Sequence, residues 1–327
     1  WLIRFTSDYY HHPIGEVAAA ALPALIRHGK PLVPITEFVS IRPAGTEADV
    51  DALRKRAPRQ AELLSTVRDA ETISASALEQ AMPGWRRASK GLVDKALIEI
   101  FQATADDEDE LLSNVEQVAG PELNPDQRRA VKTIRNTSGF AVHLIDGVTG
   151  SGKTEVYLHL IRSAIDDGKQ VLVLVPEIGL TPQLVRRFQR RLGVEPELLH
   201  SALTDTARLR AWRRVRSGQA PLIVGTRSSV FVPMKSPGLI IVDEEHDSSL
   251  KQQEGLRYSA RDLAIARGKK LDIPVLLGSA TPSLDTLQRC REAAYHVSEL
   301  PTRAGSAVPP LMRLVDLTRY DAHDGLS

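Results

Sequence analysis

The sequence predicts an α/β fold in which helices cover both faces of a parallel β-sheet, and three observations point to it. From about residue 121 onward, short runs of Val, Ile and Leu alternate with helical patterns, as in parallel sheets with helical crossovers. The segment GVTGSGKT, Gly147–Thr154, matches the phosphate-binding loop (P-loop) pattern. An apolar run, Phe140–Ile145, precedes this loop and a helical pattern, Glu155–Ile165, follows it, which is the setting that the motif requires.

The elements of this second half follow from their periodicity and length. Strands are expected at Ala141–Ile145, Gln170–Val175, Val194–Leu199, Leu222–Val224, Leu239–Val242 and Pro274–Leu277. Helices are expected at Glu155–Ile165, Pro182–Leu192, Thr206–Ser217 and Ala260–Gly268.

The first half is predicted to be mainly helical. Proline cannot donate a helical hydrogen bond, so Pro23 should break the helical stretch Ile14–His28, and an extended run follows at Pro31–Pro43. Three further helical patterns, with little strand between them, are Ala57–Arg68, Ser74–Met82 and Ser89–Ile100. The acidic run Asp106–Glu110 is typical of a solvated connector or of the start of a helix. We therefore divide the chain into residues 1–50, 51–104, 105–122, 123–310 and 311–327.

Composition restricts the class of protein. The 327 residues are 42% hydrophobic and 25% charged, as in globular domains. No apolar run reaches ~20 residues and no secretory signal is visible, so we expect a cytoplasmic protein without a membrane partner. The single cysteine, Cys290, argues against a disulfide framework and against a cysteine-rich zinc site. With a net charge of +1, any contact with nucleic acid must rest on local basic patches.

The P-loop predicts a nucleoside triphosphate site. Glycines permit backbone conformations that a Cβ forbids, so consecutive amides can turn toward phosphate oxygens, next to the positive end of a helix. Lys153 is expected to reach the outer phosphates, and the Thr154 hydroxyl to hold Mg²⁺. A glycine-rich turn with a surface lysine is the alternative. The loop residues expected to bind nucleotide are Gly147, Thr149, Gly150, Ser151, Gly152, Lys153 and Thr154.

The segment LIIVDEEH, Leu239–His246, predicts hydrolysis at this site. Asp243 ends an apolar strand, at the sheet edge where open α/β sheets bind ligands. We expect Asp243 to hold Mg²⁺ and Glu244 to orient and deprotonate the attacking water, with Lys153 as the third catalytic residue. An exposed acidic turn is the alternative interpretation.

These motifs resemble those of the superfamily 2 helicases. DEEH is similar to their DEAD/DEAH box, and GSATPS, Gly278–Ser283, to their motif III, which implies that His246, Ser279 and Thr281 couple hydrolysis to DNA. LVPEIGLTPQ and GTRSSVF resemble their strand-binding loops, and LNPDQRRAV resembles a Q-motif, which implies that Gln127 reads the adenine edge. The strand-binding residues implied are Pro176, Glu177, Thr181, Thr226, Arg227 and Ser228.

The run DSSLKQQEGLRYSARDLA, Asp247–Ala264, narrows the resemblance to the primosomal replication-restart helicases. In that family this loop is rich in aromatic residues, whereas here Leu250 and Leu256 stand where aromatics are expected. The resemblance implies that the loop contacts DNA, and a helix-capping surface loop is the alternative. The DNA-contacting residues implied in this run are Lys251, Arg257, Tyr258 and Arg261.

Three groups of basic residues have two interpretations each. They could contact DNA phosphates or form a solvated helix face. Two of them lie in the first half: Arg54, Lys55, Arg56 and Arg59, and Arg86, Arg87 and Lys90. The third lies in the predicted helix Thr206–Ser217: Arg208, Arg210, Arg213, Arg214 and Arg216.

The resemblance implies a function and an architecture. Residues 1–50 would be the end of an N-terminal domain that binds DNA 3′ ends, residues 51–104 a winged-helix domain, and residues 123–310 a RecA-like first motor lobe that uses ATP and Mg²⁺. The family unwinds DNA in the 3′→5′ direction at stalled forks. The implied partners are forked and single-stranded DNA, primosome proteins and single-stranded-DNA-binding protein.

Because the sequence holds neither the family's second lobe nor its zinc-binding cysteines, we expect weak Mg-nucleotide binding, almost no hydrolysis by this chain alone, and no zinc site. Two other functions stay open. One is a DNA-binding module in which the P-loop acts only as a switch. The other is a P-loop kinase with a small acceptor.

Overall fold

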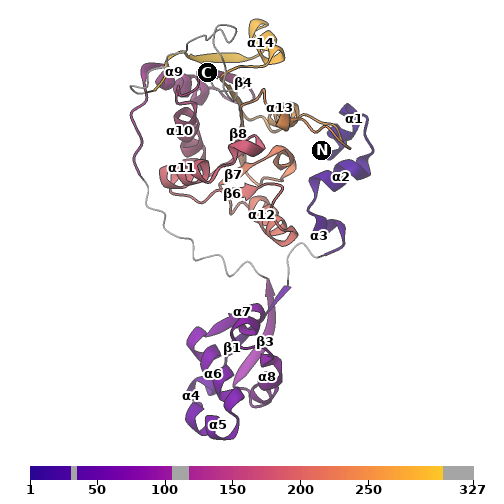
Figure 1. The fold of residues 1–327 in the computed structure, drawn as a ribbon, viewed down its shortest axis with the longest axis vertical. Coiled ribbons are helices and arrows are strands. Elements are labelled where there is room, and N and C mark those ends of the chain that lie inside the picture. Colours follow the sequence, from indigo (N-terminus) through magenta and orange to yellow (C-terminus); the bar gives the residue numbers. More distant parts are fainter. Residues whose placement is uncertain (31–34, 105–117, 305–327) are drawn as a thin grey trace, which may run out of the picture. The chain divides into compact units, whose positions relative to one another are not determined.

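The computed structural model describes residues 1–30, 35–104 and 118–304, which fall into two compact units. Among these residues, the first unit comprises 1–17, 118–201 and 215–304, and the second comprises 18–30, 35–104 and 202–214. Figure 1 shows both units. The acidic run 106–110 and the segment 311–327 lie outside the described residues.

The first unit contains a seven-stranded sheet with the strand order β10-β4-β9-β8-β5-β7-β6, in which every pairing is parallel. The predicted α/β fold with a parallel sheet is confirmed. The strands are β4 (Val142–Gly147), β5 (Gln170–Leu174), β6 (Glu197–Leu199), β7 (Leu222–Gly225), β8 (Pro237–Asp243), β9 (Val275–Ser279) and β10 (His296–Leu300).

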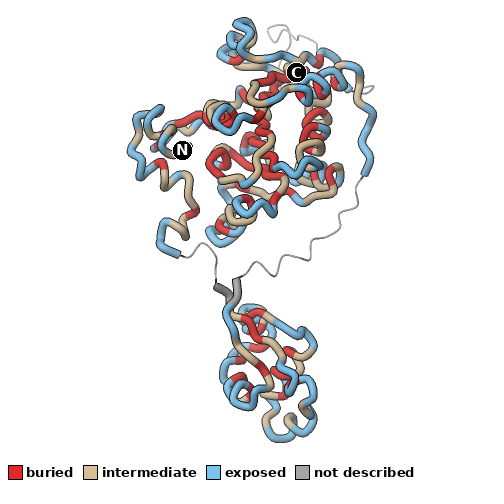
Figure 2. Tube along the Cα trace, turned by 180° about the vertical axis from the view of Figure 1, so that it is seen from behind, coloured by how far each residue is buried: buried red, intermediate tan, exposed pale blue. Residues whose placement is uncertain are grey.

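Helices pack on this sheet through apolar side chains. Ile134, Ile161 and Phe188 join Val173 and Ile241 of the sheet in one buried cluster. Figure 2 shows buried residues gathered in the interior of this unit. Because the central strands are buried along nearly their whole length, they lack the alternation of a half-exposed sheet. The helices and turns are α9 (Pro125–Arg135), α10 (Lys153–Asp166), η2 (Glu177–Gly179), α11 (Pro182–Leu192), η3 (Arg227–Phe231), η4 (Ser248–Leu250), α13 (Ala260–Leu271) and α14 (Leu284–Arg291).

The strands and helices predicted from about residue 121 onward are confirmed, and one strand is shorter than predicted. The strand expected at Val194–Leu199 is limited to Glu197–Leu199, whereas α9, α14 and β10 were not predicted. The Arg-rich helix is present as α12 (Asp205–Ser217). Each of its arginines has an interaction partner within the structure, so its contact with DNA stays a hypothesis.

The second unit contains an antiparallel sheet in the order β2-β1-β3. Leu63, Leu64 and Leu78 pack around Trp85 in its core, and all four are essentially inaccessible to solvent. The strands are β1 (Ile35–Ile41), β2 (Thr72–Ser74) and β3 (Ile98–Thr104), and the helices are α4 (Pro43–Glu47), α5 (Val50–Arg56), α6 (Pro58–Ala70), α7 (Ala75–Ala81) and α8 (Trp85–Asp94).

Two sequence-based expectations change here. Strand β1 pairs with both β2 and β3, so the domain expected to start at residue 51 includes residues 35–50 as well. The helix expected at Ser89–Ile100 ends at Asp94 and strand β3 follows. A left-handed residue, Ala96 with φ +54°, turns the chain between them, and the alternating apolar residues of β3 then pair along the whole of β1.

The N-terminal residues are helical. The break expected at Pro23 is confirmed, because α2 (Ile14–Ala21) ends before it and α3 (Ala24–Arg27) starts after it. An additional helix, α1 (Leu2–Tyr9), carries stacked aromatic rings of Trp1, Phe5 and Tyr9. Of all the helices in the described ranges, none combines the length and apolar character needed to cross a membrane.

The buried core of the antiparallel domain yields a stability prediction. Leu64→Ala should lower the free energy of unfolding by about 2–5 kcal/mol, because it leaves a cavity in a packed core. Urea unfolding followed by tryptophan fluorescence measures this, since Trp85 lies in the same core. The control is Val93→Ala on α8, where the side chain is 39% exposed and the change should stay within about 0.5 kcal/mol. Equal effects of the two changes would contradict this account of the core.

Candidate nucleotide-binding and hydrolysis site

The sheet order brings together motifs that lie far apart in the sequence. Strand β9 pairs with β4 on one side and with β8 on the other. Asp146 is opposite Ser279, and Asp243 is opposite Gly278. The P-loop, the DEEH segment (Asp243–His246) and the SAT segment (Ser279–Thr281) therefore meet at one edge of the sheet, where ligands of open α/β folds bind.

The P-loop conformation requires glycine at defined positions. Gly150 and Gly152 have φ values of +81° and +82°, in the left-handed region that side chains with a Cβ disfavour. A Cβ on Gly152 would lie 2.4 Å from Nε2 of Gln127, and a Cβ on Gly147 would lie 2.5 Å from Oγ of Ser151. The loop thus forms a compact cradle at the N-terminus of α10, a place suited to anions.

Lys153 connects the P-loop to the end of β8. Its side chain is 10% exposed, and its Nζ donates a hydrogen bond to the Gly147 carbonyl at 3.1 Å. The same nitrogen lies 3.5 Å from Oε1 of Glu244. The predicted catalytic lysine and carboxylate are therefore neighbours.

Asp243 is held by a tyrosine that the sequence did not reveal as a site residue. The Tyr157 hydroxyl donates a hydrogen bond to Oδ1 of Asp243 at 2.9 Å. Tyr157 lies four residues after Lys153 on α10, on the same helix face, which is the signal that could have identified it. It reaches Asp243 over bare backbone, because a Cβ on Gly278 would lie 1.6 Å from its hydroxyl. Burial raises the pKa of Asp243, while the hydrogen bond from Tyr157 acts in the opposite direction.

Glu244 has a backbone conformation that is unusual for its residue type. Its φ is +45°, and a non-glycine residue held in this region costs about 1–3 kcal/mol. One carboxylate oxygen faces Lys153, and Oε2 lies 3.7 Å from Nδ1 of His246. Strain of this kind is common where a side chain must point into an active site.

The three predicted coupling residues are brought together. Nδ1 of His246 and Oγ of Ser279 form a hydrogen bond of 2.7 Å, and Nε2 of His246 and Oγ1 of Thr281 form one of 3.2 Å. The Thr281 amide also donates to Oγ of Ser279 at 3.0 Å. Both ring nitrogens of His246 thus join the DEEH segment to the SAT segment.

Gln127 lies beside the P-loop and is 3% exposed. Its Nε2 donates to the Ser151 carbonyl at 2.8 Å, and its Oε1 accepts the Asn124 amide at 2.9 Å in a capping box. In this conformation the side chain supports the loop. Its contact with adenine stays a prediction.

The residues of the two strand-binding loops are only partly accessible. Glu177, Thr181 and Ser228 are exposed, whereas Pro176 and Thr226 are buried. Nη1 of Arg227 donates to the carbonyls of Ser249 and Lys251, each at 3.0 Å. Arg227 therefore braces the loop 247–258.

Two DNA-contacting residues implied by the resemblance are buried instead. Tyr258 is 6% exposed and its ring packs edge-on against Phe231 at 5.2 Å, so it is not free to stack on a base. Leu250 and Leu256, where aromatics were expected, are buried as well. Apolar packing therefore uses these positions, while Lys251 and Arg257 stay exposed.

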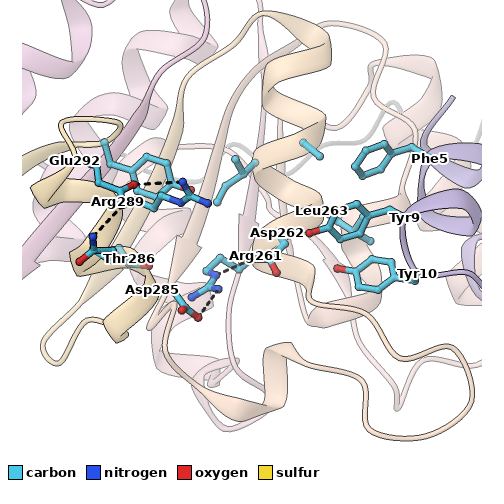
Figure 3. A pocket seen from close by; sticks show the side chains of 14 residues that line it. Phe5, Tyr9, Tyr10, Arg261, Asp262, Leu263, Asp285, Thr286, Arg289 and Glu292 are labelled. Atoms are coloured by element: carbon cyan, nitrogen blue, oxygen red, sulfur yellow. Dashed lines mark hydrogen bonds and ion pairs between the residues drawn. The ribbon is translucent and has the colours of Figure 1, made fainter.

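Arg261 is the second of these residues. It is 9% exposed and its Nη1 lies 2.9 Å from Oε2 of Glu245. Figure 3 shows it at a pocket of about 510 Å³ between α1, α13 and α14, close to Asp262 and Asp285. Burial opposes its charge, but hydrogen bonds to Glu245 and Asp262 outweigh burial and raise the pKa of Arg261. It forms an internal ion pair and is not an exposed phosphate contact.

The donor set fits Mg²⁺ bound together with a nucleotide. Asp243 and Thr154 offer a carboxylate and a hydroxyl, and Mg²⁺ prefers oxygen ligands, using one or two protein groups plus phosphate oxygens. Within the described parts of the chain, Oγ of Ser151 is buried without a hydrogen-bond partner, so a phosphate oxygen would satisfy it. No group of three or more His, Cys, Asp or Glu side chains in those parts is placed to hold a metal by itself.

The Tyr157–Asp243 contact yields a prediction on metal affinity. Tyr157→Phe keeps the buried ring and removes one hydroxyl, so Mg²⁺ should bind with the nucleotide about 10-fold more weakly. Titration of Mg²⁺ against fluorescent ADP measures this, with the exposed Tyr9→Phe as control. An unchanged Mg²⁺ dependence in Tyr157→Phe would show that the hydroxyl does not orient Asp243.

The sequence of this chain is similar to those of known proteins. The sequence model of the DEAD/DEAH box helicases matches residues 124–290. Replication restart protein PriA of Haemophilus influenzae is 42% identical over 337 residues, which cover 100% of this chain and 45% of that protein. PriA of Chlamydia pneumoniae is 35% identical over 322 residues, covering 97% of this chain and 43% of the relative.

Among solved structures, RecG bound to a three-way DNA junction is similar, with a TM-score of 0.42 and 25% identity, covering 60% of this chain and 25% of that one. The chain spans less than half the length of the curated relatives named above. The family match covers the P-loop, the DEEH segment and the SAT segment, whose geometry is described above. The chain belongs to the DEAD/DEAH box helicases.

Proposed function

We propose that this chain is the nucleotide-binding lobe of an ATP-dependent 3′→5′ DNA helicase that acts in replication restart at stalled forks. The observation that carries the proposal is the meeting of Lys153, Asp243 and Glu244 at one sheet edge, with Lys153 Nζ 3.5 Å from Glu244 Oε1. The relatives that are 42% and 35% identical to this chain are named replication restart proteins. Such a function implies a cytoplasmic location.

Each residue has a distinct role in the proposed hydrolysis. The P-loop amides and Lys153 hold the phosphates, and Thr154 and Asp243 hold Mg²⁺, which when bound neutralises charge on the transferred phosphoryl group. Glu244 orients a water molecule in line with the outer phosphate and accepts its proton. His246, Ser279 and Thr281 then transmit the state of this site to the DNA-binding loops.

The exposed loop residues would contact single-stranded DNA. Glu177, Thr181 and Ser228 follow neighbouring strands of the sheet, β5 and β7, and Lys251 and Arg257 add exposed positive charge. Contacts of this kind bind the backbone without reading sequence. Thr226 and Arg227 would shape these loops from within.

The antiparallel domain would act as a winged helix on duplex DNA. Helices α7 and α8 are joined by a short turn, Met82–Gly84, as in helix-turn-helix motifs. Arg87 and Lys90 lie on the exposed face of α8, whereas Arg86 is paired with Glu37. Arg87 and Lys90 are therefore the residues of α8 that we propose to contact phosphate.

The remaining parts of the proposal come from the family resemblance of the motifs. Primosome proteins and single-stranded-DNA-binding protein are proposed partners, and forked DNA the proposed substrate. Motors of this type receive a catalytic arginine that can contribute about 10³–10⁵ in rate. We therefore expect this chain alone to bind Mg-ATP weakly and to hydrolyse it very slowly.

Glu244→Gln tests the hydrolytic function. In the protein extended to the full length of its relatives, ATP hydrolysis on forked DNA should fall by about 10²–10⁴-fold, because Gln cannot accept the proton. Binding of Mg-ADP should stay unchanged. The control is Glu195→Gln at an exposed position. If Glu244→Gln leaves the action of the protein on forked DNA unimpaired, the result would instead favour a nucleotide-dependent switch without hydrolysis.

Arg87→Ala combined with Lys90→Ala tests the winged-helix proposal. Loss of two phosphate contacts should reduce the salt slope of duplex binding by about 1.8, because each contact contributes ~0.9. Fluorescence anisotropy at several salt concentrations measures the slope. Arg54→Ala on α5, where Arg54 pairs with Asp51, is the matched control. A salt slope equal to that of the parent would show that Arg87 and Lys90 of α8 do not contact DNA phosphates.

A further inference from the structure

The third acidic residue of the DEEH segment has no part in the hydrolysis described above. Glu245 is 3% exposed and its side chain is fully buried. A buried carboxylate is costly unless it is paired and hydrogen-bonded. Its surroundings therefore indicate what it does.

Four donors converge on the Glu245 carboxylate. Oε1 accepts the Ser283 amide at 2.7 Å. Oε2 accepts the Ser283 hydroxyl at 3.1 Å, the Thr286 hydroxyl at 3.0 Å and Nη1 of Arg261 at 2.9 Å. The Glu245 amide is used as well, since it donates to the Gly278 carbonyl of β9 at 3.0 Å.

These donors belong to the segment that carries Thr281. Ser283 follows the SAT segment by two residues and is the N-cap of α14, with its hydroxyl accepting the Thr286 amide. Glu245 therefore joins the DEEH segment to the far end of the SAT loop, while His246 joins it to Ser279 and Thr281 at the near end. Two independent sets of contacts hold the segments together.

Arg261 supplies the compensating charge. It reaches Glu245 from the first turn of α13, and its Nη1 also donates to the Ser283 hydroxyl at 2.8 Å. Figure 3 shows its guanidinium between Asp262 and Asp285. Removing either member of such a buried pair would leave an uncompensated charge, whereas an apolar replacement of both members is often tolerated.

Glu245 is also bonded directly to the strained residue Glu244. A left-handed non-glycine residue persists only where its surroundings over-determine it. On one side of Glu244, Tyr157 holds Asp243, and on the other side the four donors hold Glu245. We propose that Glu245, paired with Arg261, is a positioning residue. It holds Glu244 and the SAT segment in the relative positions that ATP hydrolysis requires.

This inference rests on the proposed hydrolytic function. It is tested in the protein extended to the full length of its relatives, by steady-state ATP hydrolysis on forked DNA. The test variant combines Glu245→Leu with Arg261→Leu. It removes the hydrogen bonds of the Glu245 carboxylate without leaving an unpaired buried charge. We expect kcat to fall at least about tenfold, while KM and the affinity for Mg-ADP stay within twofold of the parent. The thermal midpoint should stay close to that of the parent.

The matched control is Arg289→Leu combined with Glu292→Leu, an exposed ion pair at the end of α14, which should leave kcat unchanged. A folded Glu245→Leu/Arg261→Leu variant with the parent kcat overturns the inference. If that variant does not fold, Thr286→Val removes one hydroxyl donor from the cluster and should lower kcat by about threefold. A parent-like kcat in Thr286→Val then overturns the inference.

Glu244→Gln separates the two levels of the proposal. If it hydrolyses ATP as fast as the parent, the proposed function and the positioning role are both rejected. If it is inactive while the leucine pair keeps the parent kcat, only the positioning role is rejected.

Discussion

The insertion of β9 between β4 and β8 is the constraint on which the rest of the site depends. Parallel pairing on both sides of β9 places the carboxyl ends of three strands next to one another. A P-loop, an acidic pair and a polar loop then share one edge of the sheet. Because Gly278 of β9 has no side chain, Tyr157 of α10 can pass over this strand and reach Asp243.

Charge is distributed unevenly around this edge. Asp243 is half-buried and accepts a hydrogen bond from Tyr157. Glu244 is partly exposed, has a positive φ and lies beside Lys153. Glu245 points into the protein and is neutralised by Arg261. Three consecutive acidic residues thus have three environments. The low dielectric around the buried Glu245 carboxylate makes its hydrogen-bond partners decisive.

Local pattern was enough to predict most of the second half of the fold, and it singled out the loop residues that we propose to bind nucleotide. The buried strands are short runs of Val, Ile and Leu, and the P-loop is recognised from contiguous letters. The antiparallel domain was harder to predict from the sequence, because β1 pairs with strands more than thirty residues away. The end of α8 was missed because β3 follows it after a short turn that contains the left-handed residue Ala96.

By itself, the sequence determined the parallel α/β class, the family motifs, and Lys153, Asp243 and Glu244 as the expected catalytic group. These properties follow from residue type and spacing along the chain. Only the tertiary structure decided that Tyr157 holds Asp243, that Tyr258 and Arg261 are buried, and that Glu245 joins two motifs. Such roles depend on which side chains from distant segments meet, and on whether water or protein surrounds them.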